Sequence, residues 1–527
     1  SKMIPRWPGI TTPFTAKGVL MKVLLIAPPY PLEEFPSPPL GLCYAAAAFE
    51  AAGCSVRILD FIVQKYSAEK IKQTLDEFKP DVVGTNSVTM NHNQAVSILK
   101  EVKTLSPKVI ILMGGPHISF DYEASLTAHP EIDMAVIGEG EITIKEIVPV
   151  LHDRKAWASI KGIAFLDGGR LVKTPDRELL KDLDALPHPP RKMLPLSKYL
   201  ALGLPASIIT SRGCPNQCIF CVGRRMVGSK FRTRSVSLIM DEIQELLDMG
   251  FEQINFADDF FTVDKKRVKQ ICSEIKARGL NFGWSIFARA DSVDLDVMET
   301  MKDAGCHTVL FGIESGNQEI LNTVRKRIKI EQIKKAVEIS KAAGLRVFGS
   351  FIVGLPGETH ETLLDSHNLA TELDILYGYH FLSPFPGTTL MEEIENYDLE
   401  ILTDDWSRFD ANQAIVRTSS LSPEDIIGFV EEYYNKKIQA DEEDLAKRHA
   451  LGLCTETELM VMQGNKKMDV VYNLLSKDII EALAALPASN GGDITLLAES
   501  ISGLIDRKAE IVEPAITHLV KRGYLKK

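Results

Sequence analysis

The sequence lacks the features of several protein classes. Its 527 residues hold no run of about 18 apolar residues, so no membrane span is expected. Residues 1–20 contain Pro5, Pro8 and Pro13 but no apolar core segment, which argues against a secretory signal. A net charge of −11 leaves no basic excess for an extended nucleic-acid surface. We therefore expect a soluble, cytoplasmic protein without a nucleic-acid partner.

Cysteine is also scarce, with eight residues in a chain too long to be a disulfide scaffold. Five of them are scattered and are expected to be small buried residues: Cys43, Cys54, Cys272, Cys306 and Cys454. The other three are Cys214, Cys218 and Cys221, which follow a short apolar strand predicted over 206–210. This C-x-x-x-C-x-x-C spacing indicates a metal centre.

Three thiolates can hold three corners of a 4Fe-4S cube, whereas a ferredoxin-type cluster takes four. The fourth iron is then open to a small chelating molecule. Gly213 and Pro215 suit a tight loop around such a cluster, and Phe220 can cover it. A zinc site is an alternative, although zinc sites usually complete four ligands and no second C-x-x-C pair follows. Three inert buried thiols are a further alternative.

The motif, with an aromatic residue before its last cysteine, resembles that of the radical S-adenosylmethionine (SAM) enzymes. The resemblance implies that SAM chelates the open iron and that an electron from the cluster cleaves SAM to methionine and a 5′-deoxyadenosyl radical. It also implies a reducing cytoplasm, because oxygen destroys an open cluster. An external electron donor of the ferredoxin or flavodoxin type is the partner expected with it.

The length predicts two or three domains. The expected fold class is α/β, with a mostly helical C-terminal region. Residues 1–20 are interpreted as an extension or a cloning remnant. Over residues 21–150, apolar strands alternate with helical stretches, which predicts a doubly wound parallel sheet with its ligand outside the carboxyl ends of the strands. The expected strands are 23–27, 55–59, 82–85, 109–113 and 134–137, with helices including 44–52 and 93–104.

This domain resembles the cobalamin-binding domain that precedes the radical SAM core in one large subgroup. The matching stretches are Pro38-Pro-Leu-Gly41, Pro80-Asp-Val-Val-Gly84, Gly114-Gly-Pro-His117 and Gly138-Glu-Gly-Glu-Ile-Thr143. The cobalamin contacts that the resemblance implies are Tyr30, Leu40, Gly41, Ser87, Val88, Thr89, Met90, Asn91, Gly114, Gly115, Pro116, His117, Gly138, Glu139, Gly140 and Glu141.

The resemblance also bears on cobalt ligation. The D-x-H-x-x-G motif of many other cobalamin domains is missing, so cobalt would have no protein histidine, and the 87–91 loop would face its lower side. His117 would touch the corrin edge or the nucleotide tail. His92 is interpreted as an exposed or hydrogen-bonded loop histidine.

Residues 151–205 are predicted to form a linker, with a hairpin turn at Asp167-Gly-Gly-Arg170 and an extended tether over Leu186-Pro-His-Pro-Pro-Arg191. Residues 206–400 show six βα units, too few for an eight-stranded barrel, so we expect an open partial (β/α)6 barrel. The expected strands are 206–210, 253–257, 283–288, 308–312, 347–353 and 378–382, with helices 237–249, 265–278, 330–343 and 359–373 between them.

Polar residues gather at the ends of these strands, where the family resemblance implies SAM contacts. Asp258 and Asp259 take the place of a motif that contacts the SAM amino group, although its usual Gly-Gly-Glu is absent. Arg289 matches a basic residue that pairs with the SAM carboxylate. The remaining implied SAM contacts are Phe220 at the cluster, Glu314 and Ser315 at a ribose- and carboxylate-binding strand end, and Ser350 on an adenine-contacting strand.

The family pattern fades over residues 401–527. Residues 422–439 predict an amphipathic helix with a Ser-Pro-Glu cap. Helices expected over 479–486, 496–505 and 511–521, with a strand at 523–525, resemble a winged-helix unit spanning 478–527. Two roles stay open for it: a cap on the barrel, or a docking module for a peptide or protein substrate.

A chain holding cobalamin, SAM and a cluster is most simply a methyltransferase acting on an unactivated carbon. One SAM would supply the methyl group through cobalamin, and a second would supply the radical. Tyr379 and His380 are candidates to orient the substrate, with core or turn packing as the alternative. The acceptor could be a peptide or protein side chain, for example a glutamine of methyl-coenzyme M reductase, or a small molecule. The rival hypotheses are a ring-forming or rearranging radical enzyme and a non-catalytic corrinoid carrier or sensor.

Overall fold

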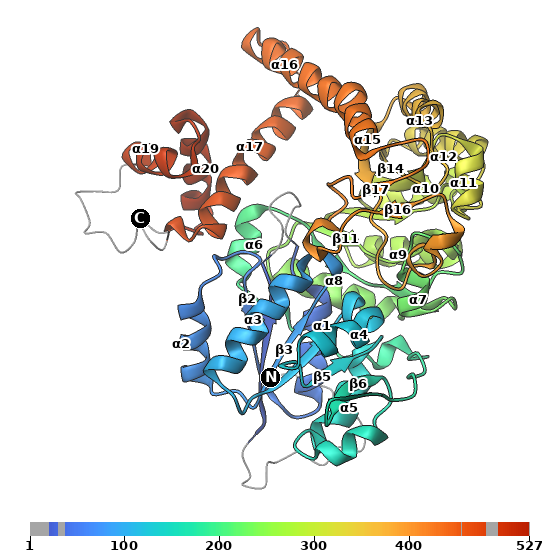
Figure 1. The fold of residues 1–527 in the computed structure, drawn as a ribbon. Coiled ribbons are helices and arrows are strands. Elements are labelled where there is room, and N and C mark those ends of the chain that lie inside the picture. The colour runs from blue at the N-terminus through green and yellow to red at the C-terminus, as the bar shows by residue number, and fades with distance from the viewer. Residues whose placement is uncertain (1–19, 30–36, 455, 481–493, 526–527) are drawn as a thin grey trace.

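The computed structural model describes residues 20–29, 37–454, 456–480 and 494–525 (Figure 1). Tyr30 and most of the helix expected over 479–486 lie outside these ranges. The described chain forms two α/β domains in contact, followed by a helical arm that leaves the second domain and returns beside the first. Among its helices, none combines the length and the apolarity that a membrane span requires.

The first domain (residues 21–173) contains a seven-stranded sheet in the order β2-β1-β3-β4-β5-β6-β7. Its first five strands are parallel, as the sequence predicts. These strands are β1 Lys22–Ala27, β2 Ser55–Asp60, β3 Val82–Asn86, β4 Ile110–Gly114 and β5 Met134–Val136. The helices between them are α1 Leu40–Ala51, α2 Ala68–Phe78, α3 His92–Leu105, α4 Pro116–Ala128 and α5 Gly140–Ile147.

Helices cover both faces of this sheet. Strand β1 reads as a nearly continuous apolar run because both of its faces are buried. Val23 and Leu25 pack in the core shared with α1 and α5, whereas Leu24 and Ile26 pack in the core shared with α2, α3 and α4. Alternate side chains of one strand thus fix helices to opposite faces, and the carboxyl ends of the strands stay open to a ligand.

Part of the expected linker belongs to this sheet. The hairpin predicted at residues 167–170 is present, and its strands β6 Ile163–Asp167 and β7 Arg170–Lys173 extend the first sheet in antiparallel pairing. Residues 174–205 then cross to the second domain and include α6 Leu196–Leu202. The first sheet therefore continues past residue 150.

The second domain holds a six-stranded parallel sheet in the order β15-β14-β13-β12-β11-β8, which confirms the partial barrel. Its strands are β8 Ala206–Ile208, β11 Gln253–Phe256, β12 Gly283–Ala288, β13 Cys306–Glu314, β14 Arg346–Val353 and β15 Leu376–Phe381. The surrounding helices are α8 Val236–Asp248, α9 Lys265–Ala277, α10 Leu295–Asp303, α11 Gln318–Thr323, α12 Ile330–Ala342 and α13 His360–Leu373.

Two shorter pieces complete this barrel domain (residues 206–417). Strand β9 Ser211–Arg212 pairs with β10 Arg232–Thr233, and α7 Gly223–Val227 lies between them in the sequence. After β15 the chain forms α14 Thr389–Glu392 and the small sheet of β16 Glu400–Ile401 and β17 Val416–Arg417.

The helical arm begins at the predicted cap. Ser422 Oγ accepts a hydrogen bond from Asp425 N at 3.2 Å, and the Asp425 carboxylate accepts one from Ser422 N at 2.8 Å. The helix is longer than expected. It runs through α15 Pro423–Val430, a π-helical turn over Glu431–Asn435 and α16 Lys436–Ala450.

The last helices are α17 Glu456–Ser476, α19 Ile494–Ile505 and α20 Ala509–Lys521. In Figure 1, α17 runs back from the tip of α16 toward α6, with α19 and α20 beside it. The strand expected at residues 523–525 is absent. Tyr524 N and Leu525 N both donate to Leu519 O, so these residues close the end of α20 as a turn. The winged-helix interpretation thus loses its expected C-terminal strand.

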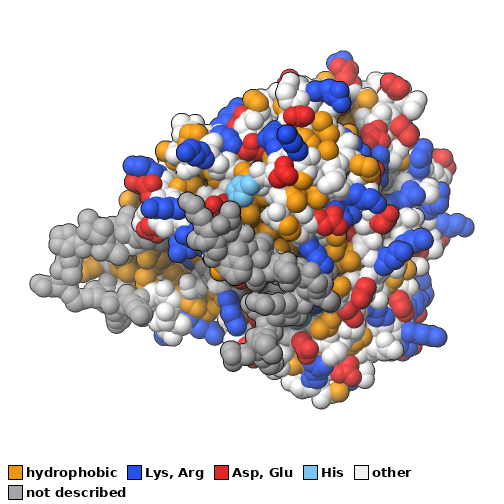
Figure 2. Space-filling view, turned by 90° about the horizontal axis from the view of Figure 1, so that it is seen from below, with side chains coloured by type: hydrophobic (Ala, Val, Ile, Leu, Met, Phe, Trp, Pro, Cys, Tyr) orange, Lys and Arg blue, Asp and Glu red, His pale blue; other side chains and the backbone are white. Residues whose placement is uncertain are grey.

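Charges are mixed on the face that Figure 2 shows. On the face in Figure 2, basic and acidic side chains alternate, and the described residues form no continuous basic area there.

One buried carboxyl stands out in the barrel. Glu358, at the loop after β14, is fully buried, and its Oε2 accepts hydrogen bonds from Gly354 N at 2.7 Å and Leu355 N at 2.9 Å. Its Oε1 has no hydrogen-bond partner among the described residues. Burial outweighs both bonds and raises the pKa of Glu358 from 4.5 to about 8.

This buried carboxyl predicts a pH-dependent stability. Between pH 4.5 and about 8 the folded chain keeps a proton on Glu358 that the unfolded chain releases, so the free energy of unfolding falls as pH rises. The slope from this group approaches about 1.4 kcal/mol per pH unit. Glu358→Gln should flatten it in chemical denaturation across pH 5–8. The exposed Glu338→Gln on α12 is the control. A wild-type slope in Glu358→Gln would contradict the assignment.

Candidate cofactor site between two domains

The three motif cysteines lie on one loop, residues 213–222, between β9 and α7. We call it the cysteine loop. Gly213 begins it with φ of +106°, and a Cβ at this position would lie 2.2 Å from Lys230 O. Only glycine fits there, as the sequence predicts for a tight loop. Ile219 N donates to Val324 O at 3.1 Å, which ties the loop to the segment after α11.

Cations face the cysteine thiols. Burial raises the pKa of Cys218, against the lowering effects of Lys326 and Arg289, and Arg289 Nη1 lies 3.9 Å from Cys218 Sγ. Burial also raises the pKa of Cys221, to about 11. Asn216 Nδ2 donates to Cys214 Sγ at 3.3 Å. The donor set is therefore three thiols with cationic neighbours that offset the charge of thiolates.

No three His, Cys, Asp or Glu side chains within the described ranges are placed to hold a single metal ion. Of the other cysteines, four are buried as expected, and Cys454 is half-buried.

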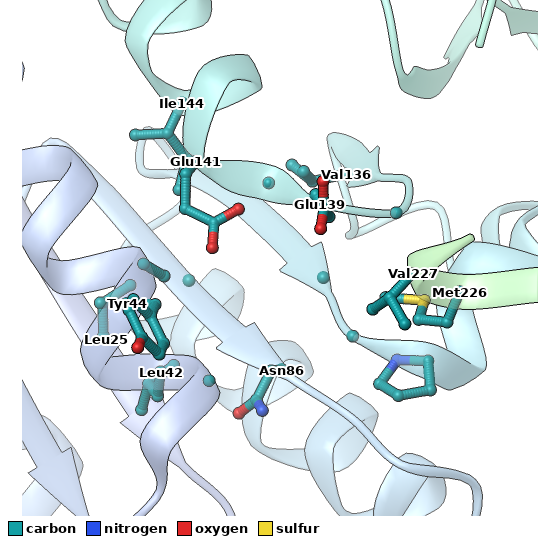
Figure 3. Close-up of a pocket in the computed structure, with 18 of the residues that line it drawn as sticks. Leu25, Leu42, Tyr44, Asn86, Val136, Glu139, Glu141, Ile144, Met226 and Val227 are labelled. Carbon is teal, nitrogen blue, oxygen red and sulfur yellow. The ribbon is translucent and has the colours of Figure 1, made fainter. Parts of the chain in front are cut away.

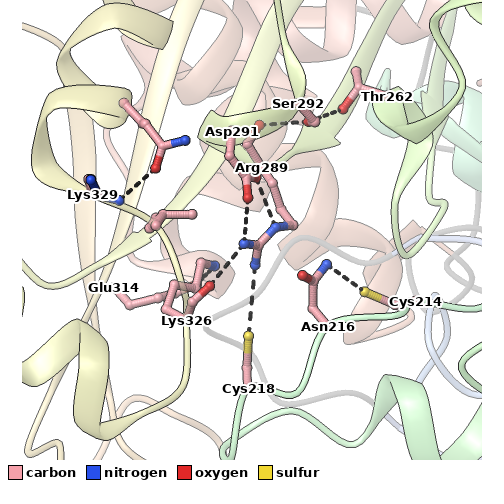
Figure 4. A network of polar contacts seen from close by, with 12 residues as sticks. Cys214, Asn216, Cys218, Thr262, Arg289, Asp291, Ser292, Glu314, Lys326 and Lys329 are labelled. Carbon is pink, nitrogen blue, oxygen red and sulfur yellow. Dashed lines mark hydrogen bonds and ion pairs between the residues drawn. The ribbon is translucent and has the colours of Figure 1, made fainter.

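Arg289, Glu314 and Lys326 form one network beside the cysteine loop (Figure 4). Arg289 donates to both carboxylate oxygens of Asp291 at 3.0 Å and to Lys326 O at 2.9 Å. Lys326 Nζ donates to Glu314 Oε1 at 2.6 Å and lies 6.0 Å from the centre of the Phe220 ring. Glu314 has a left-handed backbone, with φ of +68°, at the end of β13. Such local strain is often found at functional sites.

Two of the predicted SAM contacts, Asp258 and Ser315, are hydrogen-bonded within the protein, and their contact with SAM stays a prediction. The Asp258 carboxylate accepts hydrogen bonds from Thr210 N at 2.6 Å and Ser211 Oγ at 2.5 Å, so it fixes the strand before the cysteine loop. Ser315 Oγ is fully buried and accepts from Asn317 N at 3.1 Å. Asp259 accepts a hydrogen bond from Gly213 N at 3.2 Å and borders a cavity.

The positions of the remaining candidates differ. Phe220 and Ser350 are half-buried, on the cysteine loop and on β14. Tyr379 is buried among Phe351, Phe429 and Tyr434, which favours core packing over substrate orientation. His380 is exposed.

A cavity with about 1250 Å³ of empty space, including its open mouth, lies between the two domains. The first domain contributes apolar side chains to its lining, among them Leu25, Leu42, Phe49, Leu112 and Ile144. The barrel domain contributes Ile209, Arg212, Met226, Val227, Ala257 and Asp259. Figure 3 shows Tyr44 and Glu141 of the first domain across the cavity from Met226 and Val227, with Glu139 nearer to the latter pair.

The residues present fit a large, flat cofactor. Eight of the predicted cobalamin contacts line the cavity: Gly41, Gly114, Gly115, Pro116, Gly138, Glu139, Gly140 and Glu141. Gly115 has φ of +103°, and a Cβ there would lie 2.6 Å from Ser87 O. Backbone therefore replaces side chains along this wall, which lets a ring system approach the strand ends closely.

His117 lies in the core of the first domain, and its contact with cobalamin stays a prediction. Its ring does not line the cavity but is buried against His92, with ring centres 4.0 Å apart, and against Trp406 at 5.0 Å. His117 Nδ1 lies 3.3 Å from Thr89 Oγ1. His92, expected in a loop, is the buried first residue of α3, and burial lowers its pKa to about 3.

The 87–91 loop is held by the protein itself. Ser87 N donates to Gly114 O at 3.0 Å, and Asn91 Oδ1 accepts from Val88 N at 3.0 Å. Val88 and Met90 are half-buried, whereas Ser87, Thr89 and Asn91 are buried. Leu40 is half-buried at the start of α1. Cobalamin contacts at these positions stay a prediction.

Sequence reasoning missed two cations of the site. Arg212 lies next to the cysteine motif yet contacts carboxylates of the first domain, a pairing that no local pattern predicts. Lys326 lies in the stretch Arg325-Lys-Arg-Ile-Lys329, which is typical of a solvated surface. The burial of Lys326 between the exposed Arg325 and Arg327 is seen only in the structure, so the sequence alone carried no signal for it.

Family comparison assigns both domains. Residues 208–370 match the radical SAM superfamily, and residues 34–148 match the B12-binding domain. An uncharacterized methyltransferase of Pyrococcus horikoshii is 34% identical over 423 residues, covering 79% of this chain and 92% of that protein. An anaerobic magnesium-protoporphyrin IX monomethyl ester cyclase of Cereibacter sphaeroides is 28% identical, covering 76% of this chain and 66% of the cyclase.

Two further proteins extend this comparison. A cytidylyl-2-hydroxyethylphosphonate methyltransferase of Streptomyces wedmorensis is 28% identical, covering 71% of this chain and 81% of that enzyme. Among solved structures, the cobalamin-dependent SAM radical enzyme OxsB with aqua-cobalamin and SAM bound superposes with a TM-score of 0.69 at 18% identity, covering 96% of this chain and 82% of OxsB. This likeness shows a shared fold.

If cobalamin binds in this cavity, a bulky side chain in its lining should weaken cobalamin binding without affecting the cluster. Gly41 lies in α1, where, among the described residues, a Cβ would meet Asn86 Nδ2 alone, at 3.6 Å. Gly41→Leu should therefore fold, keep its iron and bind hydroxocobalamin at least about tenfold more weakly, a loss of about 1.4 kcal/mol. Absorbance titration measures the affinity. The matched control is Gly428→Leu in α15, where no atom of the described chain lies within 4 Å of an added Cβ. Unchanged affinity in Gly41→Leu would remove cobalamin from this cavity.

Proposed function

The chain belongs to the radical SAM superfamily, in the group that carries a B12-binding domain, and we propose that it transfers a methyl group to an unactivated carbon. A 4Fe-4S cluster, SAM and cobalamin are its cofactors. When bound, these groups supply a carbon radical and a transferable methyl group. The protein supplies binding, orientation and exclusion of water.

Each part of the site has a role in this proposal. Cys214, Cys218 and Cys221 hold the cluster, and Arg289 is near enough to Cys218 to meet an anionic group at the cluster. The pairing of Lys326 with Glu314 leaves the carboxylate in a fixed position at the end of β13. Fixed charges in a buried site need little reorganisation during reaction, so they favour one SAM orientation.

One observation carries the proposal. A single cavity is lined by the strand ends of the B12-binding domain and by residues next to the cluster motif, among them Arg212 and Asp259. A substrate radical formed in this space would lie between the source of the radical and the source of the methyl group. Enclosure by both domains also keeps water from a reactive carbon centre.

The acceptor is the finer part of the proposal. We favour a peptide or protein side chain, for example a glutamine of methyl-coenzyme M reductase, because the long helices α16 and α17 add surface beyond the barrel. The named relatives instead include enzymes of small molecules. A ring-forming radical enzyme is the second candidate, since a cyclase is among those relatives.

The proposal predicts two products from SAM. A methyltransferase of this kind releases S-adenosylhomocysteine from the methyl donor and 5′-deoxyadenosine from the radical source, in equal amounts per methylated product. A cyclase releases 5′-deoxyadenosine alone. Anaerobic incubation with SAM, hydroxocobalamin and a low-potential reductant, followed by mass spectrometry, measures both. Formation of 5′-deoxyadenosine without S-adenosylhomocysteine would reject methyl transfer.

Acceptor class is tested in the same reaction with methyl-labelled SAM. A synthetic peptide around the reductase glutamine and a small-molecule extract are offered in parallel. Label in the peptide supports the protein acceptor, and label confined to the extract rejects it. Cys221→Ala should abolish 5′-deoxyadenosine in both arms.

A further inference from the structure

Arg212 joins the two cofactor domains directly. It lies on β9, two residues before Cys214, yet its guanidinium reaches the first domain. Nη1 donates to Glu139 Oε1 at 3.1 Å, and Nη2 donates to Glu141 Oε1 at 2.6 Å. The Tyr44 ring of α1 lies 5.4 Å from its Cζ. Both glutamates line the cobalamin cavity, so Arg212 links the wall of that cavity to the cysteine loop.

A second arginine completes the bridge. Arg232 on β10 pairs with Arg212 in the β9–β10 ribbon, and the cysteine loop lies between these two strands in the sequence. Arg232 binds Glu139 through two bonds, Nη2 to Oε1 at 2.9 Å and Nη1 to Oε2 at 3.0 Å. It also donates to Leu180 O and Val227 O, each at 2.6 Å. Both strands that flank the cysteine loop are therefore bound to one carboxylate of the first domain.

The bridge is buried, with each of the four charged side chains at most 9% exposed. Burial alone would raise the pKa of Glu139, but Arg232 and Arg212 outweigh it and hold this pKa below its usual value. A charge left alone here would be costly, because water does not replace the missing partner. The two arginines and the two glutamates therefore stay paired with one another.

We propose that Arg212 couples the two cofactor sites, so that the cluster strengthens cobalamin binding and cobalamin retards loss of the cluster. A loaded cluster fixes the cysteine loop and hence Arg212 against Glu139 and Glu141, which shapes the cobalamin wall before the corrinoid binds. Linkage makes the effect on the two affinities reciprocal. A cluster held more tightly is in turn expected to leave the chain more slowly. This inference deepens the proposed function but needs only that both cofactors bind, whatever the acceptor.

The test uses the full-length chain in cluster-loaded and cluster-free forms. Titration with hydroxocobalamin gives two dissociation constants, and their ratio is the coupling. In the wild type the ratio should be at least about fivefold, the lower end of measured couplings. In the reciprocal arm, hydroxocobalamin should slow iron release from the loaded chain to a ferrous chelator.

Variants separate coupling from stability. Arg212→Gln should bring the ratio to one. Arg212→Lys should lose most of it, because a lysine cannot bind two carboxylates as the planar guanidinium does. The control is Arg278→Gln, since Arg278 pairs with Asp241 on the outside of the barrel. If Arg212 had a merely structural role, its replacement would raise both dissociation constants by the same factor and leave their ratio unchanged.

Two results would overturn the proposal: a wild-type ratio of one, or a wild-type ratio in Arg212→Gln. If Arg212→Gln does not load a cluster, Glu141→Gln is measured instead, because it removes one contact of Arg212 and keeps the pair of Glu139 with Arg232. If Glu141→Gln and Arg212→Lys both kept the wild-type ratio of dissociation constants, the coupling would be rejected. Release of S-adenosylhomocysteine is measured separately, so failure of methyl transfer stays distinguishable.

Discussion

The structure depends on a buried set of opposite charges at the boundary between two sheets. Arg212 and Arg232 of the barrel domain bind Glu139 and Glu141 of the first domain, and Arg212 and both glutamates line the same cavity. Buried ion pairs contribute little net stability, but their geometry is restrictive because each charge needs its partner. Their effect here is to fix where one domain lies over the other.

This arrangement follows from a general property of parallel sheets. Ligands bind outside the carboxyl ends of the strands, and both domains present those ends to the shared cavity. Gly114 ends β4 and Gly115 follows it, and Ala257 and Asp259 follow β11. Neither domain encloses the space alone. Two common folds, with the carboxyl ends of their strands facing each other, thus form one site for chemistry that needs a cluster-bound SAM near a corrinoid.

Much of the fold could be predicted from the sequence because both domains repeat a regular alternation. The apolar run of β1 and the spacing of Cys214, Cys218 and Cys221 carry local information that survives in three dimensions. Contacts between distant segments could not be read in this way. His117 follows a glycine-rich turn, which suggested a ligand, but Trp406 packs on it from 289 residues further along the chain, and its ring is turned into the core.

The same reason explains the other differences. Asp258 has the residue type of a ligand contact, yet Thr210 and Ser211 take both of its oxygens. The turn at residues 523–525 has a sequence suited to a strand but no neighbouring strand to pair with among the described residues.

Electron paramagnetic resonance tests most directly whether cluster and corrinoid share one cavity. The fully loaded chain is reduced so that the cluster and cobalt(II) are both paramagnetic, and its spectrum is compared with those of the two singly loaded forms. A shared cavity predicts that each centre broadens and relaxes the other. A spectrum equal to the sum of two isolated centres would contradict the account.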